Sequence, residues 1–138
     1  MRNAQRSIRT DDAPAAIGPY NQAIVIDDLG LVFTSGQIGL DPTTGNLVPG
    51  GVEAECARAL DNLEAVLRAA GSGLDSAIRA TLYLLDLGEF GKVNEVYARR
   101  VGEPLPARST VGVAALPKGA RIEIDLIARV RPDESAPR

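Results

Sequence analysis

Histidine is absent from this 138-residue sequence, and cysteine occurs only once, as Cys56. A single cysteine excludes an intramolecular disulfide, which suits a reducing compartment. Without histidine, neither the usual zinc ligand sets nor the Ser-His-Asp and Cys-His catalytic groups can be assembled. The sequence is therefore not that of a typical zinc enzyme or of a hydrolase with a histidine-activated nucleophile.

Aromatic residues are also scarce, and the chain has neither an excess of positive charge nor a long apolar run. The chain has three Tyr, two Phe and no Trp, and its formal net charge is -3. Nucleic-acid binding depends on clustered Lys and Arg, so this acidic balance argues against such a partner. No stretch approaches the roughly 18 apolar residues of a membrane span, and residues 1–10 lack the apolar core of a signal peptide. We expect a cytoplasmic protein with neither a nucleic-acid nor a membrane partner.

The length fits one domain, and no internal repeat or linker divides the chain. Residues 1–131 are therefore predicted to form a single domain. Residues 132–138 are polar and include two prolines, Pro132 and Pro137. This tail is predicted to be disordered.

Apolar spacing predicts the elements of the first half. Two apolar runs within residues 22–39 flank the turn sequence at residues 27–30, as in a β-hairpin. Residues 52–70 then show helical spacing, with Gly71 placed to end the helix. Cys56 belongs to the apolar stripe of this helix, so we interpret it as a packing residue. The stripe consists of Cys56, Leu60, Leu63, Leu67 and Ala70.

The second half predicts strand, helix and two further strands. Residues 77–87 form the strand, with Ile78 on its apolar face, and residues 89–101 form the helix, with Phe90 on its apolar stripe. The last strands, 107–116 and 121–130, would be joined as a hairpin by the short turn at 117–119. Helices that return to one face of a mixed sheet give an α+β sandwich. The other face would be open to water or to another subunit, which favours an oligomer.

Glu123 and Arg108 are the first candidates for chemistry. In residues 122–126 the three apolar side chains share one sheet face, and Glu123 projects from the other. A solvated strand face and a functional carboxylate both remain open as interpretations. Arg108 shares a face of the preceding strand with Thr110, and the predicted hairpin would bring it near Glu123. Arg108 would then form a cross-strand ion pair or bind a substrate carboxylate with its two-pronged guanidinium.

Four further positions carry weaker signals. Asn94 falls on the apolar stripe of the second helix, where it either is a satisfied core amide or supports a site. Tyr20 ends a segment of small residues. Ser35 has no histidine to activate it, but its hydroxyl can donate a hydrogen bond, and Gly36 lets a ligand approach the backbone closely. No segment here matches a phosphate-binding loop.

Taken together, these motifs resemble the reactive-intermediate deaminase (RidA) family, also called the YjgF/UK114 family, and especially its imine-hydrolysing branch. They run in the order of the family over roughly residues 6 to 131. Each motif alone is common, whereas the ordered set is highly specific. The matching segments are APAAIGPY at 13–20, SGQI at 35–38, LDN at 60–62, Val93–Asn94 with Tyr97, PARS at 106–109, LPK at 116–118 and IEI at 122–124.

The resemblance implies a chorismate-mutase-like (ferredoxin-like) α+β fold and a homotrimer with clefts between subunits. It implies hydrolysis of short 2-imino or enamine acids to 2-keto acids and ammonia, without a cofactor or metal. Arg108 is then the group that binds the substrate carboxylate, and Glu123 the group that holds or activates the attacking water. Both groups must reach one pocket. Tyr20, Ser35 and the backbone at Gly36 line the cleft by the same resemblance, and Asn94 supports it.

Thr110 departs from the family pattern, because many members have cysteine at this position. A hydroxyl of similar size fits the same space, so we expect Thr110 to retain the substrate-binding role. Two alternatives to the deaminase remain open: a trimer of the same fold that binds small carboxylates without turnover, and a ribonuclease or translation inhibitor. The retention of both Arg108 and Glu123 favours the enzyme.

Overall fold

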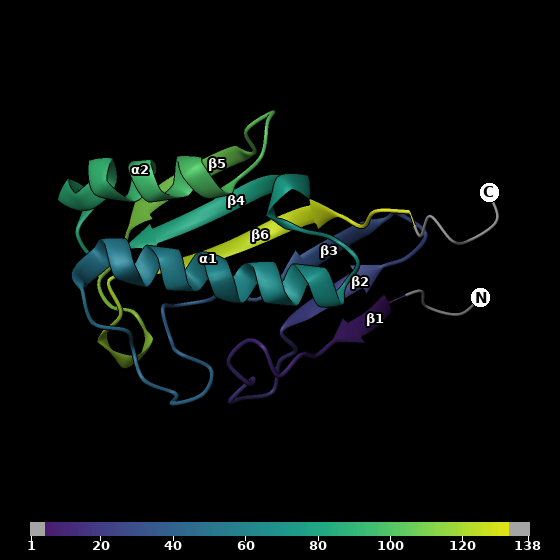
Figure 1. Cartoon of the computed structure of the whole chain (residues 1–138), viewed down its shortest axis with the longest axis horizontal. Helices are drawn as coiled ribbons and strands as arrows, with labels where there is room; N and C mark the ends of the chain where they lie inside the picture. Colours follow the sequence, from purple (N-terminus) through teal and green to yellow (C-terminus); the bar gives the residue numbers. More distant parts are fainter. Residues whose placement is uncertain (1–4, 133–138) are drawn as a thin grey trace.

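Six strands form one mixed sheet in the order β1-β2-β3-β6-β4-β5 in the computed structural model, which describes residues 5–132. Two helices cover one face of this sheet (Figure 1), as the sequence predicted for an α+β fold. Neither helix of the described chain is long and apolar enough to cross a membrane. The strands are β1 (Gln5–Ile8), β2 (Ala23–Ile26), β3 (Leu31–Thr34), β4 (Ala77–Leu84), β5 (Ala107–Gly112) and β6 (Ile122–Arg129); the helices are α1 (Gly51–Ala69) and α2 (Phe90–Arg100).

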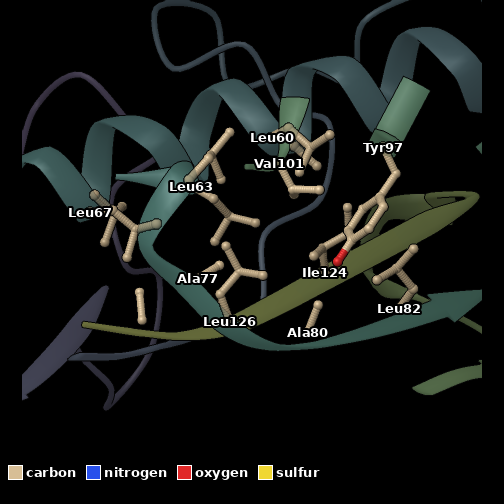
Figure 2. Packing of buried hydrophobic residues seen from close by; sticks show 14 of the residues in the cluster. Leu60, Leu63, Leu67, Ala77, Ala80, Leu82, Tyr97, Val101, Ile124 and Leu126 are labelled. Atoms are coloured by element: carbon tan, nitrogen blue, oxygen red, sulfur yellow. The ribbon is translucent and has the colours of Figure 1, made fainter. Parts of the chain in front are cut away.

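The core lies between α1 and the sheet. The predicted stripe of α1 is confirmed, because Leu60, Leu63 and Leu67 are fully buried (Figure 2). Burial of each of these side chains stabilises the fold by roughly 1.5–3 kcal/mol before entropy is subtracted. Gly71 ends the helix as predicted, with a positive φ of 81° that a residue with a side chain rarely adopts.

The strand pairing corrects one prediction. β5 and β6 do not form a hairpin: β5 pairs in parallel with β4, and β6 pairs antiparallel with the opposite edge of β4. The reason is that α2 carries the chain back across the sheet between β4 and β5, so that these two strands form a β-α-β unit. The short turn at 117–119 does not determine whether the strands on either side of it pair with each other or with β4. As a result, β4 lies between the strands that carry Arg108 and Glu123.

Local details differ from the predicted pattern at three places. A register shift between Ala77 and Arg79 leaves Ile78 exposed instead of on the apolar face. Phe90 is also exposed, although helical spacing had predicted it to pack in the core. Strand β1 pairs with β2, and no signal in the sequence had predicted it.

Several elements are also shorter than predicted. β4 ends at Leu84, β5 ends at Gly112, and α2 spans 90–100. The domain boundary at residue 131 stays a prediction. The prediction of disorder for 132–138 falls almost entirely on 133–138, which lie outside the described residues.

Candidate active site

A cavity of about 380 Å³ opens where β3 ends and β6 begins. Four of the predicted site residues line it together, and they come from three segments far apart in the sequence. These residues are Tyr20, Ser35, Gly36 and Glu123. The remaining wall is largely apolar or small, with Ile17, Ile38, Leu40 and Pro117 among its residues. A pocket of this size fits a small organic acid, with few polar groups to orient it.

Glu123 is the acidic group of this cavity. It projects from the sheet face opposite to the helices, because its neighbours Ile122 and Ile124 are buried beneath them. Its side chain is half-buried, and this burial is the main cause of a raised pKa for the carboxyl group. The nearby charge of Asp125 raises the pKa further. Glu123 therefore takes up a proton more readily than a solvated glutamate.

Gly36 is required by the position of Glu123. A Cβ atom at residue 36 would lie 2.7 Å from the Glu123 carboxyl carbon, closer than real Cβ contacts allow. Glycine thus permits the close approach of the Glu123 carboxylate to the backbone, while the close approach of a ligand at this position stays a prediction. Any larger residue would displace the Glu123 side chain from the cavity wall.

The segment after β3 is held in place from both sides. Gln37 exchanges two backbone hydrogen bonds with Ile124 of β6, at 2.9 and 3.0 Å. The fully buried Asn62 of α1 donates from Nδ2 to the carbonyl oxygens of Ile38 and Leu40, at 3.2 and 3.0 Å. This role of Asn62 was not predicted from the sequence. The signal available was a buried amide beside the apolar stripe of α1, which needs partners of its own.

Gln22 fixes the loop that carries Tyr20. Its Nε2 donates to the carbonyl oxygens of Thr10 and Pro14, and its Oε1 accepts from the Thr10 amide at 2.7 Å. Nearby, the Ser35 hydroxyl donates to the Asn21 carbonyl. The proton of Ser35 is therefore already used within the chain, and only its oxygen lone pairs remain for a ligand. The predicted ability of Ser35 to donate a hydrogen bond is used within the chain, and its contact with a ligand stays a prediction.

The other predicted residues gather around Arg108, between β5 and α2. Arg108 Nε donates to Thr110 Oγ1 at 2.8 Å, and Nη2 donates to Asn94 Oδ1 at 2.6 Å. The guanidinium carbon also lies 4.8 Å from the centre of the Tyr97 ring. Asn94 is half-buried, and its side-chain oxygen accepts from Arg108; its support of a substrate site stays a prediction.

Arg108 and Glu123 do not share a pocket within one chain. Ala80 pairs with Arg108 on one side of β4, and Tyr83 pairs with Glu123 on the other. Ala80 is buried beneath the helices, whereas Tyr83 faces the open side of the sheet, so the two functional groups lie on opposite faces. The expectation that a hairpin brings them together is wrong, and so is a cross-strand ion pair between them.

Two charged or polar features near Glu123 were not predicted. Lys118 lines the same cavity and has a left-handed backbone, with a φ of 58°. On the open sheet face, the Tyr83 hydroxyl donates to Asp125 Oδ2 at 2.9 Å. Residues 5–132 contain no cluster of His, Cys, Asp and Glu that could hold a metal ion.

Comparison with known proteins extends the likeness to nearly the whole chain. Residues 10–130 match the family model described as Endoribonuclease L-PSP. A mouse protein named 2-iminobutanoate/2-iminopropanoate deaminase is 48% identical over 124 residues, which cover 90% of each chain. The crystal structure of RidA from an Antarctic Psychrobacter is 41% identical, with a TM-score of 0.86 over 91% of this chain and 99% of that one. The structure of E. coli TdcF with bound serine is 40% identical, with a TM-score of 0.84 over 92% and 99%.

Similarity of this extent in both sequence and coordinates defines a small α+β protein of the Rid type. The chain belongs to the family that the model describes as Endoribonuclease L-PSP, and its predicted likeness to RidA and UK114 proteins is confirmed.

Proposed function

We propose that this protein is an enzyme that hydrolyses short 2-imino acids and their enamine forms, such as 2-aminoacrylate, to 2-keto acids and ammonia. The observation that carries the proposal is Glu123, a half-buried carboxylate with a raised pKa that faces a small cavity. Relatives with nearly half of their residues identical over most of the chain are named deaminases of 2-imino acids, which supports the same reaction here.

The chemistry needs only positioning and one proton-transfer group. Water adds to the electrophilic carbon of the protonated imine while Glu123 accepts one proton of the water, and a neutral carbinolamine forms. Glu123 returns that proton to the nitrogen; ammonia then leaves as the carbinolamine hydroxyl gives its proton to Glu123, and the 2-keto acid remains. Arg108 binds the carboxylate of the substrate and so orients the carbon for attack. The raised pKa suits Glu123 to both steps, since it has to gain and lose a proton near neutral pH.

The complete site is formed between two copies of the chain. Arg108 with Asn94 and Thr110 comes from one copy, and Glu123 with Tyr20, Ser35 and Gly36 comes from its neighbour. Opposite placement of Arg108 and Glu123 within one chain supports this arrangement, because a contact that joins them is head-to-tail, and head-to-tail contacts form a ring when the rotation closes. The exposed Phe33 and Val111 on the open sheet face also favour coverage by another copy. We propose the homotrimer that the resemblance implies, acting in the cytoplasm.

Ammonia release from 2-aminoacrylate or 2-aminocrotonate, generated in place by a dehydratase, tests the proposal. We expect acceleration over the spontaneous rate, loss of that acceleration in Arg108→Ala and strong reduction in Glu123→Gln. Arg108→Lys is expected to lower kcat/KM about tenfold to hundredfold, because an ammonium cannot make the planar two-point contact. Turnover in Arg108→Lys equal to that of the unmodified protein would contradict the role given to the guanidinium.

A ribonuclease is the second candidate, because the matching family model carries the description Endoribonuclease L-PSP. The net charge of -3 and the absence of histidine make it the weaker one. Metal-independent cleavage of a defined RNA, abolished in Arg108→Ala, would favour it. Tight binding of 2-keto acids without ammonia release would instead indicate the carboxylate-binding trimer.

A further inference from the structure

The guanidinium of Arg108 contacts two aromatic rings of α2. Its Cζ lies 4.8 Å from the centre of the Tyr97 ring and 5.3 Å from the centre of the Phe90 ring. Both distances fall within the range in which a cation is attracted to the electron-rich face of an aromatic ring. The two rings lie about two helical turns apart, at the first residue of α2 and near its end.

Packing in the core explains Tyr97 but does not explain Phe90. Tyr97 is 4% exposed, and Figure 2 shows its ring reaching from α2 toward Ile124 and Leu82. Phe90 is 45% exposed, although its place in the sequence fits the apolar stripe of the helix. The contact of the Phe90 ring with the Arg108 guanidinium gives a reason for an aromatic residue at this partly exposed position.

All the partners of Arg108 are uncharged. Thr110 and Asn94 accept from Nε and Nη2, and the two rings contact the guanidinium plane. No carboxylate within residues 5–132 forms an ion pair with it, in contrast to Arg121, which is paired with the buried Glu55. An aromatic face restrains a guanidinium without using its N–H groups. The positive charge and the Nη1 donors of Arg108 are therefore available to a ligand.

We propose that Phe90 is a positioning residue of the active site, which together with Tyr97 holds the Arg108 guanidinium in the plane needed to bind a substrate carboxylate. This inference rests on the proposed function, in which Arg108 binds that carboxylate. Phe90 acts through Arg108. A long arginine side chain that is already restrained loses less conformational entropy on binding, so affinity for the carboxylate is higher.

Phe90→Leu and Phe90→Tyr form a matched pair for the kinetic test. Leu keeps an apolar side chain but has no ring, whereas Tyr keeps the ring face. We expect Phe90→Leu to raise KM for the imino acid about twofold to fivefold, equivalent to about 0.5–1 kcal/mol for a partly exposed cation–π contact, with kcat little changed. Phe90→Tyr should have a KM close to that of the unmodified protein. A KM in Phe90→Leu equal to that of the unmodified protein, or a rise that Tyr does not reverse, overturns the proposal.

NMR of the arginine side-chain N–H groups tests the same contact without any turnover. The Arg108 signal is assigned by its loss in Arg108→Lys. Ring faces shift nearby protons upfield, so we expect the Arg108 signal to move downfield in Phe90→Leu and to stay in place in Phe90→Tyr. An unchanged signal in Phe90→Leu overturns the positioning role even if the protein is a deaminase. A shifted signal in a protein without imine hydrolysis would show that the contact exists and that the proposed reaction is wrong.

Discussion

Arg108 and Glu123 project from opposite faces of one sheet, and strand β4 separates the strands that carry them. Each group has its own surroundings: uncharged hydrogen-bond partners and aromatic rings around Arg108, and a cavity with a close backbone around Glu123. A single chain thus holds two half-sites. In the ring of identical chains that we propose, the half-sites of neighbours would meet at each interface.

The pH dependence of turnover should be sensitive to the charge of Asp125, because this charge raises the pKa of Glu123. Glu123 must be ionised to accept a proton from water, so activity falls as the pH drops through its raised pKa. Burial and Asp125 both contribute to the rise. The other titratable groups nearby are Tyr83 on the sheet face and Tyr20 and Lys118 on the cavity wall. Asp125→Asn removes the like charge and keeps an acceptor for the Tyr83 hydroxyl.

We therefore expect Asp125→Asn to shift the acid limb of the kcat profile to lower pH. The shift should be partial, because burial is the larger cause and remains. Tyr83→Phe is the control for disruption of this part of the sheet face. An acid limb that stays in place in Asp125→Asn would mean that Glu123 is not the group seen in the profile.

The stability of the protein should depend on pH through the same carboxylate. Because the pKa of Glu123 in the folded protein lies above the ordinary value of 4.5, the folded state binds its proton more tightly than the unfolded state does. This contribution to stability is fully present below pH 4.5 and is lost as the pH rises through the raised pKa. Gln resembles the protonated form at every pH.

Glu123→Gln should therefore melt at a higher temperature than the unmodified protein at neutral pH, with the difference shrinking toward pH 4.5. Thermal unfolding followed by circular dichroism over this pH range measures the effect. A variant that is less stable at neutral pH would show that Glu123 makes favourable contacts as an anion.

Cys56 should matter for stability and not for turnover. Its thiol is fully buried in the core, and burial raises its pKa to about 12, so it stays protonated and poorly nucleophilic. Cys56→Ser places a hydroxyl in an apolar environment and should cost about 1–3 kcal/mol of unfolding free energy. Denaturant unfolding measures this cost. Loss of turnover in a fully folded Cys56→Ser protein would give the thiol a catalytic role.

Two tyrosines allow a comparison between a buried hydroxyl group and a partly exposed one. The Tyr97 hydroxyl is buried with no hydrogen-bond partner among the described residues, whereas the Tyr83 hydroxyl donates to Asp125. An unsatisfied buried polar group is unfavourable, so Tyr97→Phe should stabilise the fold by about 1 kcal/mol, and Tyr83→Phe should destabilise it by a similar amount. Equal destabilisation in both variants would show that the Tyr97 hydroxyl does find a partner in solution.

Periodicity in the sequence was sufficient to predict α1, its leucine stripe and the outward placement of Glu123, because these depend only on spacing within one element. The pairing of β5 was not predictable in this way, since it depends on where α2 returns the chain. The role of Asn62 was missed, and the placement of Phe90 was wrong, for a related reason. Each contacts a segment distant in sequence, Asn62 the loop after β3 and Phe90 the guanidinium of Arg108.

Mixing two variants of low or no activity tests most directly whether neighbouring copies share the site. Arg108→Ala and Glu123→Gln each damage one half-site, and a ring that contains both chains has some interfaces with an intact Arg108 and an intact Glu123. Random mixing of equal amounts should restore about one quarter of the normal rate per chain. An interface is active only when one chain supplies an intact Arg108 and its neighbour supplies an intact Glu123, and each group is intact in half of the chains. Each variant taken alone through the same mixing is the control. Rings shown by mass spectrometry to contain both chains, yet no more active than either variant alone, would contradict a shared site.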